Sequence, residues 1–377
     1  MGGTLLSVKG GINMRIIKME DLLARTEQHT VLYISYDNEA FMNTGIQESG
    51  TTPYGASTTT GPGGKKIKGK VGIKEDYILG FSLLGHKSGF FATANVAYPL
   101  DFMGKVIEAM KTPGGGFIQV YAPCPRGWRH EGDQTLAVAK LATESGYWPL
   151  ITVRVKNGQP KYSFSRVPNQ KKVEGECIST DKDKVLELIK AQGKFRHLLK
   201  PEFLEKNIDE IIGQVEARNA NLNHLLASMG EQDPEERYQV IGMKVPEQKL
   251  INPGHGLCPG CGAGMMLNQL TSAAYTVAKD NTIFVNNTCC VEVATSKDDV
   301  TSWESTWVHQ LFESGSTVAD AISTTYRILK NKGIKDKVPY VIHMGGDGST
   351  VNIGFQFLKS SIVRSCGYQI MNEDLKL

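Results

Sequence analysis

The chain has 377 residues, enough to bury a large core as two or three average domains or as one extended α/β domain. Its 42 basic and 39 acidic residues leave a formal net charge of +3, so no global positive field points to a nucleic-acid partner. No apolar stretch approaches the roughly 20 residues that span a membrane, and residues 1–11 lack a signal-peptide pattern, so a cytoplasmic location without a membrane partner is expected.

Short apolar runs alternate with segments of helical periodicity, which predicts an α/β fold with a mostly parallel sheet and helices on both faces. In chain order, strands are predicted at Thr30–Tyr36, Gly116–Tyr121, Thr282–Asn286 and Val338–Met344. Apolar residues at helical spacing predict helices over 318–329 and 353–362. The charged, amphipathic stretch Pro201–Leu226 is predicted to be an outer helical arm, and the polar residues 229–243 to be a linker.

Each predicted strand is followed by a residue that could bind a ligand. In a parallel sheet the carboxyl ends of the strands share one edge, where loops and helix N-termini converge. The candidate ligands at these four ends are Asn38, Cys124, Cys289 with Cys290, and Asp347. Four such residues together predict a single site.

The sequence Gly345–Ser349, read Gly-Gly-Asp-Gly-Ser, has the form of the first half of a thiamine diphosphate and magnesium site. Such a motif needs a second strand that ends in an Asn-bearing loop about 30 residues later, and none follows before Leu377. A loop of the required form, Asp37–Gly45, instead follows the first predicted strand. Gly-Asp-Gly alone is more often a simple turn, but the Asn loop favours a site for a hard cation and a diphosphate.

Cysteine spacing provides a second signal, because seven cysteines in a reducing compartment are not expected to form disulfides. Cys258 and Cys261 form a Cys-x-x-Cys pair just before a predicted helix, and Cys124 with Cys290 would bring the number of thiolates to four. Four thiolates could hold zinc or an iron–sulfur cluster, and the spacing does not separate the two. Plain burial is expected for Cys177 and Cys366, and partly for Cys289.

Six segments spread over most of the chain carry motifs of one known family: Tyr36–Gln47 with Thr52–Ala56, Ala122–Trp128, Gly254–Gly262, Cys290–Val293, Trp307–His309 and Gly345–Ser349. In these segments the chain resembles the thiamine-diphosphate-binding β subunits of 2-oxoacid:ferredoxin oxidoreductases, particularly the pyruvate and 2-oxoisovalerate type. The resemblance implies three resident cofactors: thiamine diphosphate, Mg²⁺ and a four-iron four-sulfur cluster.

The resemblance also implies roles for particular residues. The expected cluster ligands are Cys258, Cys261, Cys290 and Cys124, with Cys289 standing where the family usually has Gly. The expected Mg²⁺ ligands are Asp347, Asn38 and the main-chain carbonyl of Ala40. The residues expected to bind the organic cofactor are Gly346, Asp347, Gly348, Ser349, Asn38, Asn43, Thr44 and Cys290, and Asn43 is the candidate catalytic residue.

The implied reaction is the oxidative decarboxylation of a 2-oxoacid, with pyruvate weakly favoured, to an acyl-CoA with reduction of ferredoxin. Coenzyme A is the implied co-substrate. Partner subunits are implied as well: an α subunit that supplies the Glu activating the cofactor's aminopyrimidine ring, together with γ- and δ-type subunits. The alternatives are a non-oxidative thiamine-dependent decarboxylase and a metal-stabilised subunit that only binds partners.

The order of the segments departs from the family. Residues 29–228 resemble the family's second half and precede residues 244–365, which resemble its first half, with 229–243 joining them. The chain is therefore predicted to be circularly permuted, with 29–200 and 244–365 forming one cofactor-binding domain. Residues 1–28 and 366–377 match no predicted element. The rival hypothesis is a gene rearrangement whose product is not a working subunit.

Overall fold

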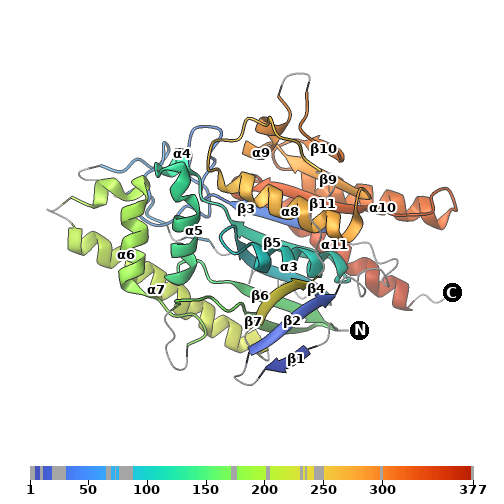
Figure 1. Cartoon of the computed structure of the whole chain (residues 1–377), viewed down its shortest axis with the longest axis horizontal. Coiled ribbons are helices and arrows are strands. Elements are labelled where there is room, and N and C mark those ends of the chain that lie inside the picture. Colours follow the sequence, from blue (N-terminus) through green and yellow to red (C-terminus); the bar gives the residue numbers. More distant parts are fainter. Residues whose placement is uncertain are drawn as a thin grey trace.

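A central eight-stranded sheet organises the molecule (Figure 1). In spatial order it consists of β10 (Thr306–Gln310), β9 (Thr282–Asn287), β11 (Tyr340–Gly346), β3 (Val31–Asp37), β5 (Gly116–Tyr121), β4 (Ser88–Asn95), β6 (Ile151–Lys156) and β7 (Gln159–Phe164). The first six strands are parallel to one another. β6 then pairs antiparallel with β4, and β7 pairs antiparallel with β6. The computed structural model describes residues 5–8, 12–18, 31–64, 69–72, 74–75, 88–170, 176–200, 204–229, 232–233, 236–241, 250–297 and 300–374. The predicted mostly parallel α/β fold is confirmed.

Two strands from opposite ends of the chain meet at the middle of this sheet. β11 pairs in parallel with β3, in a register that runs from Val341 opposite Val31 to Gly346 opposite Tyr36. Both strands therefore end at the same edge. The loop that follows each of them, one carrying Asp347 and the other Asn38, begins at that edge.

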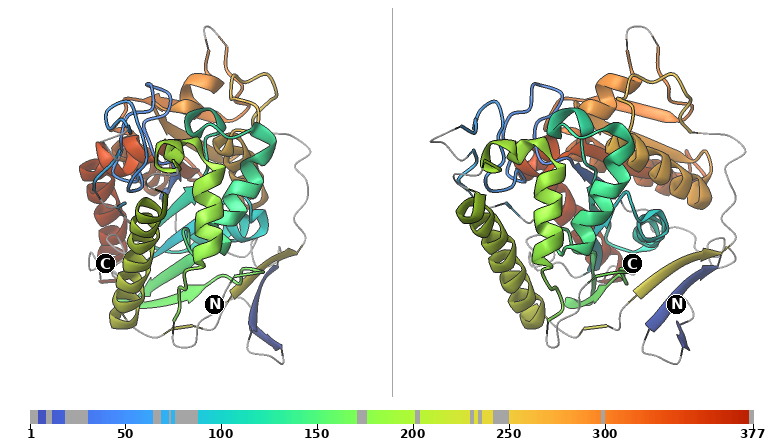
Figure 2. Two further views of the ribbon diagram at one scale, coloured as in Figure 1. Left: turned by 90° about the vertical axis from the view of Figure 1, so that its left-hand side faces the viewer. Right: turned by 60° about the vertical axis from the view of Figure 1, so that its left-hand side comes forward.

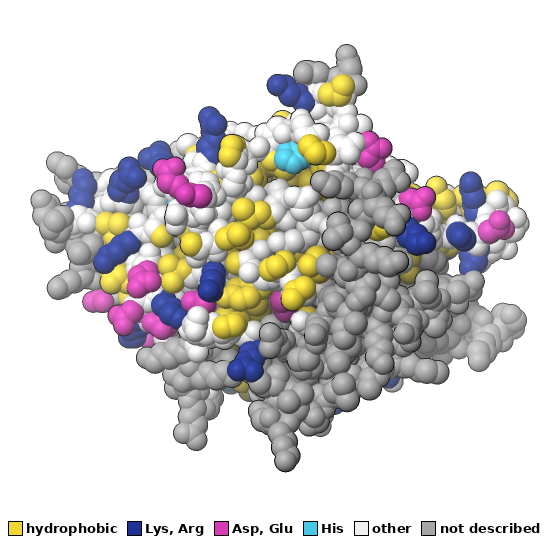
Figure 3. All heavy atoms as spheres, viewed as in Figure 1, with side chains coloured by type: hydrophobic (Ala, Val, Ile, Leu, Met, Phe, Trp, Pro, Cys, Tyr) yellow, Lys and Arg dark blue, Asp and Glu magenta, His cyan; other side chains and the backbone are white. Residues whose placement is uncertain are grey.

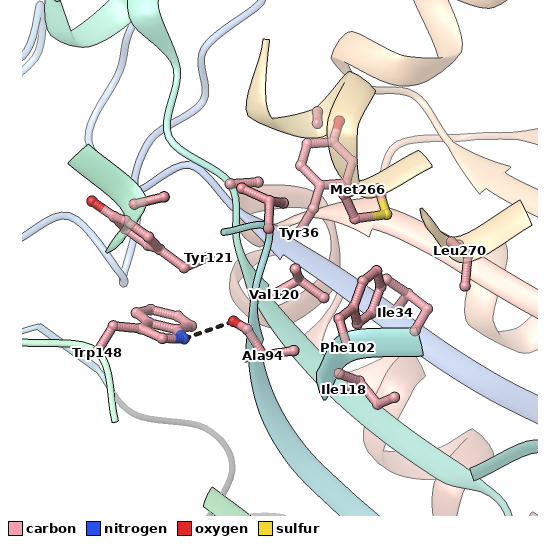
Figure 4. Close-up of a cluster of buried hydrophobic side chains, with 14 of the residues drawn as sticks. Ile34, Tyr36, Ala94, Phe102, Ile118, Val120, Tyr121, Trp148, Met266 and Leu270 are labelled. Carbon is pink, nitrogen blue, oxygen red and sulfur yellow. Dashed lines mark hydrogen bonds between the residues drawn. The ribbon is translucent and has the colours of Figure 1, made fainter. Parts of the chain in front are cut away.

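The sheet is buried on both faces, and its side chains alternate between two cores. In β3, Leu32, Ile34 and Tyr36 point into one core, whereas Val31 and Tyr33 point into the other, as the two-residue period of a strand requires. The first core contains α3 (Pro99–Lys111) and α8 (Gly262–Ala278). Figure 4 shows part of it, with Phe102 of α3 and Met266 of α8 beside the strands. The second core contains α10 (Gly315–Asn331) and α11 (Phe355–Asp374). Helices therefore cover both faces, as the sequence predicts.

Three further helices, α5 (Thr135–Glu144), α6 (Lys182–Ala191) and α7 (Leu204–Met229), pack beyond β4 (Figure 2). The stretch predicted to be an outer helical arm forms α7, which packs on the rest of the fold through the buried side chains of Ile211, Val215 and Leu226. Charged residues of α7 take part in this packing, since Glu210 accepts from the hydroxyl of Tyr54 at 3.0 Å and Arg218 donates to the carbonyl of Tyr147 at 2.5 Å. No helix in the described part of the chain combines the length and apolarity needed to cross a membrane.

A separate three-stranded sheet contains β1 (Leu5–Val8), β2 (Ile12–Lys18) and β8 (Glu236–Ile241). The prediction of a linker over 229–243 is therefore wrong for β8, and part of the unassigned segment 1–28 is its partner. The sequence of β8, Glu-Arg-Tyr-Gln-Val-Ile, contains β-favouring residues, but the polar run before it concealed the strand. In the unassigned tail, α11 continues to Asp374.

The strand β8 is anchored on α3 through Tyr238. The Tyr238 ring lies so close to Gly104 that an added Cβ would be 2.4 Å from it, and the hydroxyl donates to Glu108 at 2.9 Å. This contact attaches the small sheet to the large one.

The charge distribution agrees with the composition. On the face drawn in Figure 3, basic and acidic side chains are interspersed toward one side, and hydrophobic side chains gather over its middle. Leu100 and Leu136 are about half exposed. No single-sign field covers the described part of this face.

Two glycine substitutions test the contact between β8 and α3. Gly104→Ala should destabilise the protein by about 1–3 kcal/mol because the new methyl group collides with Tyr238. Gly213→Ala, in the middle of α7 with no atom near the added methyl, should stabilise it by roughly 0.5–1 kcal/mol. Thermal and urea unfolding measure both. Equal stabilisation by the two substitutions would contradict the packing of Tyr238 on α3.

Candidate functional site

One pocket lies at the edge where β3, β9 and β11 end. It encloses about 370 Å³, including space open to solvent. The residues that line it are Tyr36, Asn38, Ala40, Phe41, Met42, Asn43, Thr44, Thr288, Cys289, Cys290, Phe312, Gly346, Gly348 and Ser349. All the residues predicted to bind the organic cofactor except Asp347 are among them, although they come from both ends of the chain.

Three oxygen-bearing groups meet beside this pocket, and two of them belong to residues that line it, Asn38 and Ala40. One terminal atom of the Asn38 side-chain amide lies 2.8 Å from the carbonyl oxygen of Ala40 and 3.1 Å from Oδ1 of Asp347. If that atom is nitrogen, it donates to both oxygens. If the amide is turned, its oxygen joins the other two, and an amide oxygen, a carbonyl and a carboxylate are the donors that Mg²⁺ prefers. The residues predicted to hold the cation therefore offer donors that suit Mg²⁺, and they lie beside Gly346 and Gly348.

Glycines give this site its shape. At Gly346 an added Cβ would meet only the Tyr36 ring at 3.7 Å, which leaves the backbone open to the pocket. At Gly348 an added Cβ would lie 2.4 Å from the Phe41 ring, which itself stacks on Phe312 with centroids 5.8 Å apart. A diphosphate could therefore approach the main chain closely along Gly346–Ser349. Asn43 and Thr44 lie on the exposed rim of the pocket.

The loop after β3 is held in shape by Glu39, which lies between two of the candidate cation ligands. Its backbone is left-handed, with φ of 68°, a conformation that costs energy for a non-glycine residue. Its amide donates to Asp37 at 2.8 Å, and its carbonyl accepts from Thr52 at 2.6 Å. The strain at this residue is offset by these contacts and by those of its side chain.

The Glu39 carboxylate is fully buried and forms ion pairs with two lysines. Lys74 donates to one carboxylate oxygen at 2.8 Å, Lys194 donates to the other, and the Tyr147 hydroxyl also donates to the group. Burial acts to raise the pKa of this carboxyl, but the ammonium groups of Lys194 and Lys74 dominate and lower it to about 2. The Glu39 carboxylate is therefore ionised, and its ion pairs hold the loop in place. Nothing in the sequence indicates this cluster, because Lys194 is 155 residues from Glu39.

Two further buried carboxylates, those of Asp37 and Asp347, share one hydroxyl group. Thr51 Oγ1 lies 2.9 Å from Asp37 Oδ1 and 2.7 Å from Asp347 Oδ2, and Ser49 Oγ donates to the same Asp347 oxygen at 2.6 Å. Burial, together with the charge of Asp37, raises the pKa of Asp347 to about 7. One threonine hydrogen cannot serve both carboxylates, so without a cation the pair retains a proton near neutral pH. A cation would take the place of that proton.

The turn that carries Asp347 has its own buried support. Asn287 on β9 donates to the carbonyl of Ser349 at 3.2 Å, and its amide oxygen lies 3.1 Å from Nε2 of His343. Burial lowers the pKa of His343 to about 3, so the imidazole is neutral and can donate to Asn287. These residues were also missed from the sequence, because each reads as an ordinary strand position.

The four predicted cluster cysteines occupy loops around the same edge. Cys124 immediately precedes the one-turn helix α4 (Pro125–Trp128), Cys261 immediately precedes α8, and Cys290 begins α9 (Cys290–Thr295). All four, including Cys258, are half-buried and unpaired in disulfides. Burial raises the pKa of the Cys290 thiol, and the neighbouring thiol of Cys289 raises it further. Backbone hydrogen bonds from Gly262 to Pro123 at 3.2 Å and from Gly256 to Ala294 at 2.7 Å join the Cys258–Cys261 loop to the Cys124 segment and to α9.

Cys289 has a different environment from its neighbour. It is buried, its sulfur accepts from Asn286 at 3.2 Å, and it bonds to the hydroxyl of Tyr36. Cys177 was expected to be buried but is only half-buried, and it donates to Gln232 at 3.3 Å. The side chain of Cys366 falls outside the described residues.

The described residues contain no group of three or more His, Cys, Asp or Glu side chains close enough to ligate a single metal ion. The oxygen site does not need one, since it combines a single carboxylate with an amide and a carbonyl. The ligands of an iron–sulfur cluster surround a group larger than one ion. Burial raises the pKa of Cys124 to about 11, so cluster assembly would have to displace protons from the thiols.

Comparison with known proteins identifies relatives of two kinds. The chain is 40% identical over 190 residues to pyruvate synthase subunit PorB of Thermotoga maritima, covering 50% of this chain and 53% of that protein. It is 43% identical over 174 residues to ketoisovalerate oxidoreductase subunit VorB of Pyrococcus abyssi, covering 46% and 51%. It is 38% identical over 226 residues to PorB of Pyrococcus furiosus, covering 57% and 65%. No protein-family model matches the chain.

The predicted resemblance is confirmed. The relatives are subunits of the two oxidoreductase types named from the motifs, pyruvate and 2-oxoisovalerate. The chain spans about half to two thirds of the length of these curated relatives. Activity, cofactors, substrate and partners of this chain are therefore proposals.

The raised pKa of Asp347 predicts how the metal-free protein responds to pH. The folded state holds a proton up to about pH 7, whereas the unfolded chain loses it near the ordinary aspartate pKa of 3.8. This contribution to the free energy of unfolding is complete below about pH 4, declines as the pH rises, and is lost above about pH 7. Urea unfolding without divalent cations should show a loss on the order of 4 kcal/mol over this range, which Asp347→Asn should largely remove. The same pH dependence in wild type and variant would contradict the assignment.

Proposed function

We propose that this chain is a thiamine-diphosphate- and Mg²⁺-binding β subunit of a 2-oxoacid:ferredoxin oxidoreductase that also holds a four-iron four-sulfur cluster. The proposal is carried by one observation: three oxygen donors, from Asn38, Ala40 and Asp347, meet beside a glycine-lined pocket. The relatives named pyruvate synthase and ketoisovalerate oxidoreductase subunits support it independently. The cytoplasmic location expected from the sequence stays a prediction.

In this proposal Asp347, Asn38 and the Ala40 carbonyl would hold Mg²⁺, and the backbone of Gly346–Ser349 would accommodate the diphosphate. Ser49 and Thr51 orient the Asp347 carboxylate through hydrogen bonds of 2.6 and 2.7 Å. When bound, the organic cofactor supplies the carbanion chemistry that releases carbon dioxide from a 2-oxoacid, and the cluster accepts electrons one at a time. Asn43 and Thr44, on the pocket rim, would contact the cofactor's diphosphate and reacting end.

The proposed cluster ligands are Cys124, Cys258, Cys261 and Cys290. Cys290 is favoured over Cys289 because Cys290 is only half-buried, whereas Cys289 is buried and engaged by Asn286 and Tyr36. A cluster beside the pocket gives electrons leaving the substrate a nearby acceptor. Pyruvate is the favoured substrate, coenzyme A the co-substrate, and ferredoxin the final acceptor.

We also propose that the inverted order of the two halves is a circular permutation that leaves one working site. The parallel pairing of β11 with β3 supports this, because it brings the loops of both halves to one edge of one sheet. An α subunit, with γ- and δ-type subunits, would complete the enzyme. The chain by itself is expected to be inactive.

Cofactor binding tests the oxygen site. Wild-type protein should bind thiamine diphosphate only with Mg²⁺ present, and Asp347→Asn should weaken that binding by about 100-fold or more because a charged ligand is lost. Asp320→Asn is the matched control, since Asp320 is also buried but pairs with Arg364 in the other core. Isothermal titration calorimetry measures all three. An Asp347→Asn protein that binds as well as the control would refute the magnesium assignment.

Anaerobic reconstitution tests the sulfur ligands. Wild-type protein should acquire about four iron atoms per chain and a brown colour. Cys290→Ser should lose both, and Cys289→Ser should keep them, because the Cys289 side chain is buried and already bonded to Asn286 and Tyr36. A colourless wild-type protein that holds zinc would favour the metal-stabilised, non-catalytic alternative.

Activity is tested by co-expression with α-type subunits, followed by coenzyme-A-dependent reduction of ferredoxin with a panel of 2-oxoacids. Pyruvate should give the fastest turnover. Decarboxylation without ferredoxin reduction would favour the non-oxidative alternative.

A further inference from the structure

One segment lies between the two proposed cofactor sites and contacts both. This bridging segment, residues 122–135, runs from the end of β5 through Cys124 and α4 to the first residue of α5. It carries a proposed cluster ligand at one point and packs against the cation-binding loop at another. Its contacts can therefore be followed from one site to the other.

Toward the cation loop, the bridging segment makes three close contacts. The amide of Ala122 donates to the carbonyl of Asp37 at 2.8 Å. The indole of Trp128 donates to the carbonyl of Asn38, also at 2.8 Å. The backbone of Gly127 is so near the Met42 side chain that an added Cβ would lie 2.2 Å from its sulfur. The position of Asn38 is thus fixed largely by α4.

Toward the Cys258–Cys261 loop, the bridging segment is packed as closely. Gly262 donates its amide to the carbonyl of Pro123 at 3.2 Å, and Thr135 Oγ1 donates to the carbonyl of Gly260 at 2.6 Å. The backbones of Gly132 and Gly260 touch, since a Cβ added to Gly260 would lie 2.1 Å from the Gly132 carbonyl oxygen. Movement of the cysteine loop must therefore move the bridging segment, because close-packed backbones do not deform independently.

The link between Cys124 and Trp128 is short and stiff. Cys124 caps the single turn of α4, with its sulfur accepting the Gly127 amide at 3.2 Å. Trp128 is fully buried, and the ammonium group of Lys194 lies 4.5 Å above its ring while pairing with Glu39. The indole cannot shift without disturbing either the Asn38 carbonyl or the ion pair that anchors the cation loop.

We infer that the two cofactor sites are thermodynamically coupled through the bridging segment, with Trp128 as the positioning residue that acts through Asn38. Seating a cluster on Cys124 fixes α4, which holds the Asn38 backbone in the conformation that binds the cation. By linkage, a bound cation favours the cluster by the same factor. The inference rests on the proposed function, and it goes beyond it, because two sites on one chain could equally fill independently.

The test uses Mn²⁺ as a probe for the Mg²⁺ site, titrated by electron paramagnetic resonance into the full chain with saturating thiamine diphosphate. The titration is done on protein with and without reconstituted cluster. In wild type the cluster should lower the Kd of Mn²⁺ by about fivefold or more. In Trp128→Phe, which keeps the ring but loses the indole donor, the Kd should no longer depend on the cluster.

Trp148→Phe is the matched control. Trp148 is also buried, and its indole donates to the carbonyl of Ala94 at the same 2.8 Å, as Figure 4 shows, but it lies outside the bridging segment. This variant should keep the fivefold effect. If Trp128→Phe fails to fold, Thr135→Val tests the other end of the bridge, because it removes the bond to Gly260 and should also abolish the coupling.

Reciprocity provides a second readout. In wild type, Mn²⁺ with thiamine diphosphate should slow the loss of cluster absorbance to a chelator, and in Trp128→Phe it should not. An identical Mn²⁺ Kd with and without cluster in wild type would overturn the coupling, and a fivefold effect that survives in Trp128→Phe would overturn the role of Trp128. If wild type binds no Mn²⁺ in either state, the proposed function itself fails, and that result is recognisable because no Kd can be measured.

Discussion

The parallel pairing of β11 with β3 is the constraint on which the rest of the molecule depends. It joins two segments from opposite ends of the chain at the centre of the sheet and sets their register. Because of that register, the Asp347 turn and the Asn38 loop leave the sheet at the same edge. Every contact at the base of the pocket, including the bonds from Ser49 and Thr51 to Asp347, requires this alignment. A slip of one residue would turn alternate side chains of β3 to the wrong core.

Buried charge stabilises this arrangement at a cost. Placing the Glu39 carboxylate and two ammonium groups in the interior requires desolvation that hydrophobic residues of similar volume would avoid. The ion pairs place fixed partners on both carboxylate oxygens, and they hold a left-handed residue between Asn38 and Ala40. Apolar side chains could fill the same volume, but they would not orient the flanking amide and carbonyl. The ion pairs of Glu39 with Lys74 and Lys194 are therefore better explained by the geometry of the loop than by stability alone.

The sequence predicted the parts of this protein that are local. The strands β3, β5, β9 and β11 stand out as short apolar runs, and the Gly-Asp-Gly turn, the Asn loop and the Cys-x-x-Cys pair are contiguous motifs. The parts that escaped prediction are contacts between distant segments. In the sequence Lys194 resembles an ordinary surface lysine, but in the structure it pairs with Glu39. Trp128 resembles an ordinary core residue, but its indole donates to the carbonyl of Asn38. β8 was also missed, because a polar run precedes it and its partner β2 lies more than 200 residues earlier in the chain.

The separation of Ser49 and Asp347 along the chain, 298 residues, also bears on how the protein is made. Synthesis proceeds from the N-terminus, so the Asn38 loop leaves the ribosome long before the strand that will lie beside it. Until β11 has been synthesised, one edge of β3 has no strand to pair with. The Thr51 hydroxyl can then bond to Asp37 but not yet to Asp347. Pairings between distant segments form slowly, because the intervening chain must first be closed into a loop. The contacts between the Asn38 loop and the Asp347 turn therefore form late in the synthesis of each chain, after nearly all of the sheet has been translated.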